Sequence, residues 1–405
     1  MHRPLYFILC LILFSCQREP TERVPSSQEL IIGEWKEFHS DRERGFYTGK
    51  YYPFTSTSLG ALQGLTFAPD SIFIYKTGYF ERLEGFSKKR RAPSRYLGDT
   101  SSYFIRNDSL YFYDLKDRKW MPLSIQKLTK DTLILRRDKD FAASYVKQNF
   151  TKTTRPEIDR ITFSSHRCMG YCPIYDLILN KNGEVILFGY DFLDFEGPHI
   201  ANIGEKRFNA ILDNFYKASP YDLKEQYGSG DDGWGMTLSL SHKNYIFKSI
   251  YNYEFDEMPA ELYWAYRPLI FMYEEVDFKP LPLDDIPDYL DVIVYKFKYN
   301  KLVGHLESTE SLLLWDYLRN GKETREKFEE LYILTFNSLS DKYDNWFPPS
   351  HLASSSKSIS KITSDGRYYK FYYKSKPPVT VDIGFNFVNN NPGEISFIRD
   401  RSKLN

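Results

Sequence analysis

Residues 161–190 read ITFSSHRCMGYCPIYDLILNKNGEVILFGY, and this stretch decides the fold of the middle of the chain. An apolar run at 161–165 predicts one strand, and residues 175–179 and 184–190 predict two more. Between the last two lies Asn182-Gly183, a pair that adopts positive φ at low cost and is typical of tight β-hairpins. The stretch therefore predicts an antiparallel sheet with two neighbouring strands joined by a short turn.

The sequence after this hairpin predicts helices that pack on the sheet. Apolar residues recur at helical spacing and would form one face of a helix: Phe208, Ile211, Leu212, Phe215 and Tyr216. Two more strands are expected at 236–241 and 245–251, and a second helix after Pro259, kinked by Pro268. Residues 156–277 are therefore predicted to form one α+β domain.

The start of this domain resembles a family of uncharacterised bacterial envelope domains marked by the pattern Cys-x-Gly-x-Cys-Pro-x-Tyr. The matching residues are Cys168, Gly170, Cys172, Pro173 and Tyr175, with Gly183 in the hairpin turn and Gly197 before the helix. Because the function of that family is unknown, the resemblance implies a fold and no activity.

Cys168 and Cys172 allow three interpretations. As a disulfide they would close a five-residue loop. The other two cysteines, Cys10 and Cys16, belong to an N-terminal segment that resembles an export signal, described below, and an even pair left in the folded part of an exported chain favours this pairing. A metal site could use His166, but no second pair of ligands at zinc spacing exists. A redox-active pair would have two intervening residues at a helix N-terminus. We expect a structural disulfide.

Short alternating runs separated by turns predict an antiparallel β barrel or sandwich over residues 31–137. The segments 33–35, 67–71 and 128–135 resemble lipocalin-like domains of bacterial envelope proteins. We expect aromatic side chains to fill the interior: Phe67, Phe73, Tyr75, Phe104, Tyr111 and Tyr113. A small apolar ligand in the barrel is the alternative. Residues 138–155 are polar and predict a linker, with a short helix at 141–148.

Residues 283–405 predict a third, α+β region. A strand is expected at 292–299, helices at about 309–320 and 322–330, and strands at 332–336, 367–373 and 379–387. This region could pack onto the second domain. The overall fold class is therefore multidomain, with an N-terminal β barrel or sandwich followed by α+β domains with antiparallel sheets and a few packed helices.

The N-terminus resembles a lipoprotein signal. Residues 1–15 combine a basic start with an apolar run too short to span a bilayer. Residues 13–16 resemble the bacterial lipobox, with Phe14 in place of the usual smaller residue. The resemblance implies that Cys16 becomes the acylated first residue, that palmitate or a similar chain holds the protein on the membrane, and that 16–30 is a spacer. An ordinary signal peptide with an incidental cysteine is the alternative.

Composition limits the function further. The 405 residues contain 54 basic and 54 acidic side chains, so nothing indicates nucleic-acid binding. Aromatic residues make up 17%, which favours strands. The sequence lacks the Gly-x-Ser-x-Gly, His-Glu-x-x-His and phosphate-loop motifs, so we assign no catalytic residue, cofactor or metal.

Three features could still carry chemistry. Asp191, Asp194, Glu196 and His199 could serve acid/base work, although the apolar residues between them favour the exposed face of a strand and turn. Residues 228–235 are rich in Gly and Asp but lack the glutamate of an EF-hand, which favours a flexible loop over a calcium site. Aromatic clusters at 51–54, 251–253 and 346–349 could bind glycan or peptide.

The sequence therefore favours a lipid-anchored protein of a Gram-negative envelope, with the outer membrane as its expected location. Its expected role is a non-enzymatic binding or structural module with a glycan, peptide or protein partner. One alternative is a hydrolase of glycan or peptide that uses Asp194, Glu196 or His199, which carboxylates converging in a cleft would favour. The other is a carrier of a small apolar ligand in the barrel.

Overall fold

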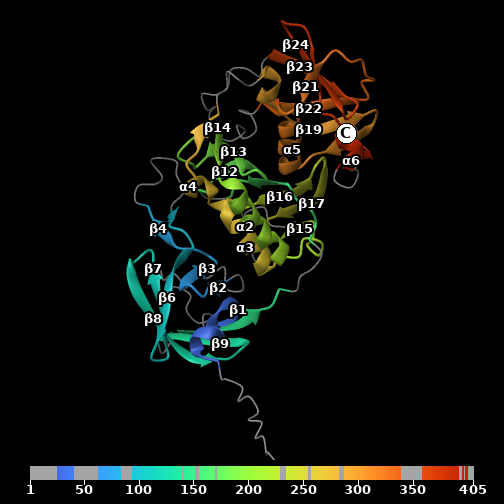
Figure 1. Cartoon of the computed structure of the whole chain (residues 1–405). Coiled ribbons are helices and arrows are strands. Elements are labelled where there is room, and N and C mark those ends of the chain that lie inside the picture. The colour runs from blue at the N-terminus through green and yellow to red at the C-terminus, as the bar shows by residue number, and fades with distance from the viewer. Residues whose placement is uncertain are drawn as a thin grey trace, which may run out of the picture.

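The computed structural model consists of a barrel and two large sheets that follow one another along the molecule (Figure 1). It describes residues 25–40, 63–83, 94–138, 141–150, 155–168, 171–228, 234–253, 257–281, 287–338, 358–391, 395 and 397–399. The multidomain, mainly antiparallel fold class is confirmed. Within these ranges no helix combines the length and the apolar character needed to cross a membrane.

The barrel is closed, with strand order β1-β10-β9-β8-β7-β6-β3-β2. Its strands are β1 (Gly33–Ser40), β2 (Gly64–Phe67), β3 (Ile72–Tyr75), β6 (Thr100–Arg106), β7 (Ser109–Asp114), β8 (Lys119–Leu128), β9 (Thr132–Asp138) and β10 (Phe141–Gln148). A short helix, α1 (Ser27–Ile31), starts inside the expected spacer with a capping box between Ser26 and Glu29. A separate two-stranded ribbon of β4 (Phe80–Arg82) and β5 (Ser94–Tyr96) follows β3.

Aromatic rings fill the barrel, as expected, but only half of the predicted rings lie inside. Phe67, Phe73 and Tyr75 are 1% exposed and pack with Trp35 and Phe112. The prediction is wrong for three others, which lie on the outer face: Phe104, Tyr111 and Tyr113. Side chains alternate along a strand, and Tyr103, Leu110 and Phe112 take the inward positions.

The predicted linker at 138–155 contains the strand that closes the barrel. Residues 141–148 form β10, which pairs with β1 and β9, so the expected short helix is wrong. Its sequence, FAASYVKQ, buries Ala143 and Tyr145 in the barrel. Two inward positions are enough for a strand whose backbone groups are paired on both sides.

The central sheet has strand order β15-β17-β16-β11-β12-β13-β14-β18. The strands are β11 (Arg160–Ser165), β12 (Ile174–Asn180), β13 (Glu184–Asp191), β14 (Gly197–Asn202), β15 (Gln226–Tyr227), β16 (Met236–His242), β17 (Tyr245–Asn252) and β18 (Lys279–Pro280). The same unit contains three helices: α2 (Gly204–Lys217) follows β14, and α3 (Ala260–Ile270) and α4 (Met272–Glu275) follow β17. The predicted hairpin is confirmed: β12 pairs with β13, and Gly183 has φ of +84°.

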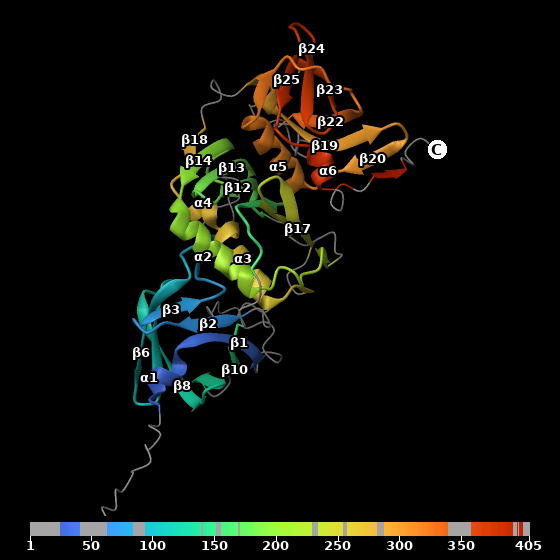
Figure 2. The same ribbon diagram turned by 45° about the vertical axis from the view of Figure 1, so that its right-hand side comes forward.

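One face of the central sheet packs on α2 and α3, and four of the five apolar residues predicted for the first helix are buried there. The other face packs on α5 (Ser308–Arg319), which also contacts the third sheet (Figure 2). Because both faces are covered, β11, β12 and β13 are buried along most of their length.

The third sheet has strand order β21-β25-β24-β23-β22-β19-β20-β26. The strands are β19 (Val292–Tyr299), β20 (Leu302–His305), β21 (Lys322–Thr324), β22 (Tyr332–Ser338), β23 (Ile359–Ser364), β24 (Tyr368–Tyr373), β25 (Val379–Asp382) and β26 (Phe397–Arg399), with the helices η6 (Asp288–Asp291) and α6 (Phe387–Asn390). The predicted helix at 322–330 is wrong, because residues 322–324 pair with β25 as an edge strand.

Candidate functional site: a cleft between the barrel and the central sheet

The predicted disulfide joins Cys168 and Cys172. It closes the loop between β11 and β12, which excludes a metal site made by the two thiolates. His166, the further ligand considered for a metal, instead shares a 2.5 Å hydrogen bond with the Thr237 hydroxyl. Among the residues that the structure describes, no group of three or more His, Cys, Asp or Glu could hold a metal ion.

The tyrosine of the Cys-x-Gly-x-Cys-Pro-x-Tyr pattern has a packing explanation. Tyr175 is fully buried, and its hydroxyl donates to the carbonyls of Leu269 and Ile270, both at 2.8 Å. Those carbonyls belong to the last turn of α3, where the Leu269 carbonyl also accepts a backbone N–H at the helix cap. The tyrosine therefore ties the start of β12 to the end of α3, immediately before α4.

The disulfide loop supports one wall of a cleft. Tyr171 is 44% exposed and packs edge-on against Phe192, with ring centroids 5.5 Å apart. Phe192 has φ of +60°, a conformation that bulky residues rarely adopt and that often marks functional sites. The Asp191 carboxylate supports this turn by accepting from the Phe192 amide at 2.9 Å.

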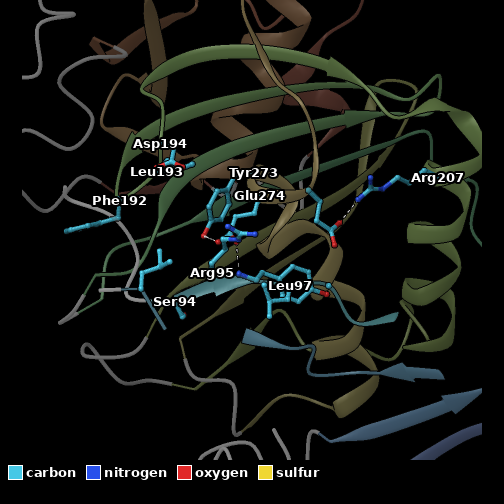
Figure 3. Close-up of a pocket in the computed structure, with 13 residues that line it drawn as sticks. Ser94, Arg95, Leu97, Phe192, Leu193, Asp194, Arg207, Tyr273 and Glu274 are labelled. Carbon is cyan, nitrogen blue, oxygen red and sulfur yellow. Dashed lines mark hydrogen bonds and ion pairs between the residues drawn. The ribbon is translucent and has the colours of Figure 1, made fainter. Parts of the chain in front are cut away.

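The cleft has a volume of about 840 Å³ and lies between the β4–β5 ribbon and the central sheet (Figure 3). One wall comes from Leu83 and from Ser94 to Gly98, another from Phe192 to Asp194, and the rest from Arg207 and the segment Tyr273 to Glu275. In Figure 3, Arg95, Tyr273 and Glu274 lie close together, with Asp194 and Leu193 beyond them. Clefts between structural units are common places for ligands.

Glu274 is held in this cleft by two hydrogen bonds. Its Oε2 accepts from the Tyr96 amide at 2.6 Å, and its Oε1 accepts from the Tyr273 hydroxyl at 2.8 Å. Burial raises the pKa of Glu274 above 4.5, although these two hydrogen bonds and Arg95 oppose the shift. Asp194 adds to the increase, because a second carboxylate nearby disfavours ionisation.

Glu275 is engaged in an ion pair. Its Oε2 lies 2.5 Å from Nη2 of Arg207 on α2. Burial raises the pKa of Glu275, and the Arg207 guanidinium limits that increase. The cleft therefore contains three carboxylates and two guanidinium groups, with Asp194 and Arg95 on exposed positions.

Arg267 of α3 holds the ribbon beside the cleft in place. It is 5% exposed and donates from Nη2 to the Thr77 carbonyl. Its guanidinium carbon lies 4.4 to 5.6 Å from the centroids of four rings: Phe80, Tyr96, Tyr263 and Phe271. Ion pairs between Lys36 and Glu261 and between Glu34 and Lys217 add to the contact between barrel and central unit.

The four polar residues predicted after the hairpin do not form one site. Asp194 and Glu196 are exposed, as expected, and Asp194 lines the cleft. For Asp191 and His199 the expectation of exposure is wrong, since each is 8% exposed. His199 packs against Phe195 and lies within 3.1 Å of the Gly197 carbonyl.

Four charged residues of the cleft were not predicted from the sequence: Arg95, Arg207, Glu274 and Glu275. They come from three separate segments and form no motif at fixed spacing. The proposed lipid site, Cys16, lies outside the described residues, as do the aromatic clusters at 51–54 and 346–349 and most of the Gly/Asp-rich segment.

Comparison with known proteins gives a family match within the central unit. Residues 159–273 match a family model described as a domain of unknown function, DUF6438. The match runs from the residue before β11 to the cleft residue Tyr273, so it covers the disulfide and one side of the cleft. No curated protein matches the chain.

Proposed function

We propose that this chain is a lipid-anchored protein of the bacterial envelope that binds a hydroxyl-rich ligand, a glycan segment, in the cleft. The observation that carries the proposal is the lining of the cleft, which combines the exposed residues Arg95 and Asp194 with the half-buried Phe192. Charged planar groups exchange hydrogen bonds with hydroxyls, and a ring offers flat apolar area.

Binding is favoured over catalysis because the buried carboxylates are already engaged. Both oxygens of Glu274 accept hydrogen bonds from the chain itself, and Glu275 is paired with Arg207. A carboxylate fixed in this way stabilises the walls of a cleft rather than exchanging protons with a ligand.

Calorimetric titration with chitotetraose, maltotetraose and cellotetraose tests this proposal. Arg95→Ala and Asp194→Ala should each weaken the binding of a positive probe by about 10-fold or more, because each removes a charge-assisted hydrogen bond. Glu196→Ala is the matched control, since Glu196 is exposed nearby but does not line the cleft. Equal affinity in all three variants would place the ligand elsewhere.

Glycoside hydrolysis is the second candidate, because Asp194 and Glu274 line one cleft and burial raises the pKa of Glu274, as a general acid requires. Release of new reducing ends by the wild type and its loss in Glu274→Gln, with binding retained, would support an enzyme. Binding without any such release would support the binding module alone.

The membrane anchor has its own test. Metabolic labelling with palmitate should label the wild type and leave Cys16→Ala unlabelled, because the thiol of Cys16 starts the acylation. Equal labelling of both proteins would contradict the proposed anchor.

A further inference from the structure

A cluster of aromatic rings covers the outer face of the barrel at β6, β7 and β8. Phe104 and Tyr111 are paired in the sheet, and their rings stack with centroids 4.7 Å apart and planes at 7°. Trp120 packs edge-on against Phe104 at 4.9 Å and against Tyr113 at 5.6 Å. Trp120 remains 45% exposed, which is unusual for so large a ring.

The contacts with the central unit described above come from other parts of the barrel, such as Lys36 of β1 and Thr77 after β3. In Figure 1 and Figure 2, β6 lies along the left flank of the barrel and β8 toward its lower end, and the central sheet lies above the barrel. The rings do not contribute to the barrel core, which is made by the inward residues of the same strands, such as Tyr103, Leu110 and Phe112. We call the set Phe104, Tyr111, Tyr113 and Trp120 the outer aromatic face.

The strands that carry this face have an excess of positive charge, in a chain whose net charge is zero. Residues 100–138 contain eight Lys or Arg and five Asp, a difference of +3. The exposed cations in this range are Arg106, Arg118, Lys119, Lys127, Lys130 and Arg136. Such a combination of rings and cations complements the anionic surface of a bilayer, where Trp and Tyr favour the headgroup region.

The chain enters the structure beside the same strands. The first described residue, Pro25, is nine positions after Cys16, a distance of at most about 30 Å when extended. It leads directly into α1, which packs against β8. An acylated Cys16 would therefore keep the bilayer within reach of the outer aromatic face.

We propose that the outer aromatic face rests on an anionic phospholipid bilayer and orients the protein on the membrane. The inference rests on the proposed lipid anchor for its location, but the contact itself needs no acyl chain. It adds a second attachment beside the acylated N-terminus, and it leaves the ribbon side of the barrel free to present the cleft.

Vesicle binding by the full mature chain without its lipid, carrying Cys16→Ser, tests the contact separately from acylation. The protein should sediment with vesicles of phosphatidylglycerol and phosphatidylethanolamine, and phosphatidylcholine vesicles should bind it at least 10-fold more weakly. Trp120→Ser should lower the partition coefficient about 10-fold, because a large exposed ring no longer enters the interface. The paired reversal Arg106→Glu and Arg136→Glu should lower it by at least as much.

Tyr299→Ser is the matched control, since Tyr299 is 40% exposed on the third sheet, and it should bind like the parent. Brominated lipids should quench Trp120 fluorescence, measured as the difference between the parent and Trp120→Phe. The proposal is overturned if the Trp120→Ser protein binds anionic vesicles like its parent, or if neutral vesicles bind the parent equally well. It is also overturned if an insoluble polysaccharide captures the protein through Trp120 while vesicles do not. If palmitate labelling fails, the proposed anchor is wrong. The vesicle results still test the contact, because the protein in that assay carries no lipid.

Discussion

Arg267 provides a direct test of how the barrel is attached to the central unit. Its guanidinium lies among four rings, closest to Phe271 at 4.4 Å, and it is the donor to the Thr77 carbonyl. The adjacent Gly78 has φ of +73°, and a Cβ there would lie 2.9 Å from Nη2 of Arg267. The local backbone therefore makes room for this side chain.

The effect of Arg267→Met follows from three contributions. Loss of a donor to the buried Thr77 carbonyl costs about 1–3 kcal/mol. Loss of a desolvated cation over the rings costs about 2 kcal/mol. The substitution also removes a buried charge whose Nε has no partner, and this offsets part of the cost. The net loss of stability should therefore be about 2 kcal/mol. Arg267→Ala also leaves a cavity and should lose about 4 kcal/mol.

Native-state hydrogen exchange is the appropriate assay, because a chain of several units does not unfold in one step. The amide of Tyr79 donates to the Gly98 carbonyl and that of Leu97 to the Tyr79 carbonyl, so both report opening of the ribbon. A loss of about 2 kcal/mol should speed their exchange about 30-fold in Arg267→Met.

The amide of Leu334, in the third sheet, should exchange at the wild-type rate in the same variant. Exchange at Tyr79 and Leu97 within threefold of wild type would refute the reasoning. It would mean that the guanidinium stabilises the contact only through its volume.

Three further outcomes are expected. Cys168→Ser with Cys172→Ser should lose about 2 kcal/mol by the loop-entropy relation, and its urea midpoint should no longer respond to a reductant; a response that persists would contradict this. The pKa of Glu274 is higher in the folded state, so its protonation stabilises the fold below about 4.5, and this stability is lost as pH rises through the raised pKa. Relative to Glu274→Gln, the wild type should therefore lose stability between pH 4.5 and 7, and a constant difference across that range would be evidence against it. Gly183→Ala should cost about 2 kcal/mol in thermal unfolding, because φ is +84° and a Cβ would lie 2.3 Å from the Gly204 backbone; an unchanged melting temperature would count against the strain.

Local sequence was enough to predict the structure wherever a short segment determines its own conformation. The Asn182-Gly183 turn, the five-residue disulfide loop and the apolar stripe of α2 were all predictable. In each case the controlling interactions join residues within about eight positions, so spacing along the chain carries the information. The same holds for the alternation that predicted the β barrel.

Tertiary structure decided which side of a strand faces the core and which distant residues meet. The sequence of β7 alternates between two sets of large side chains, and only barrel closure turned Phe112 inward and Tyr111 outward. Residues 141–148 form a strand because β1 and β9 offer backbone hydrogen-bonding partners on both sides of this segment. The cleft joins Arg95, Asp194 and Glu274, separated by roughly 80 to 100 positions each, through contacts that burial and hydrogen bonding create after the chain has folded.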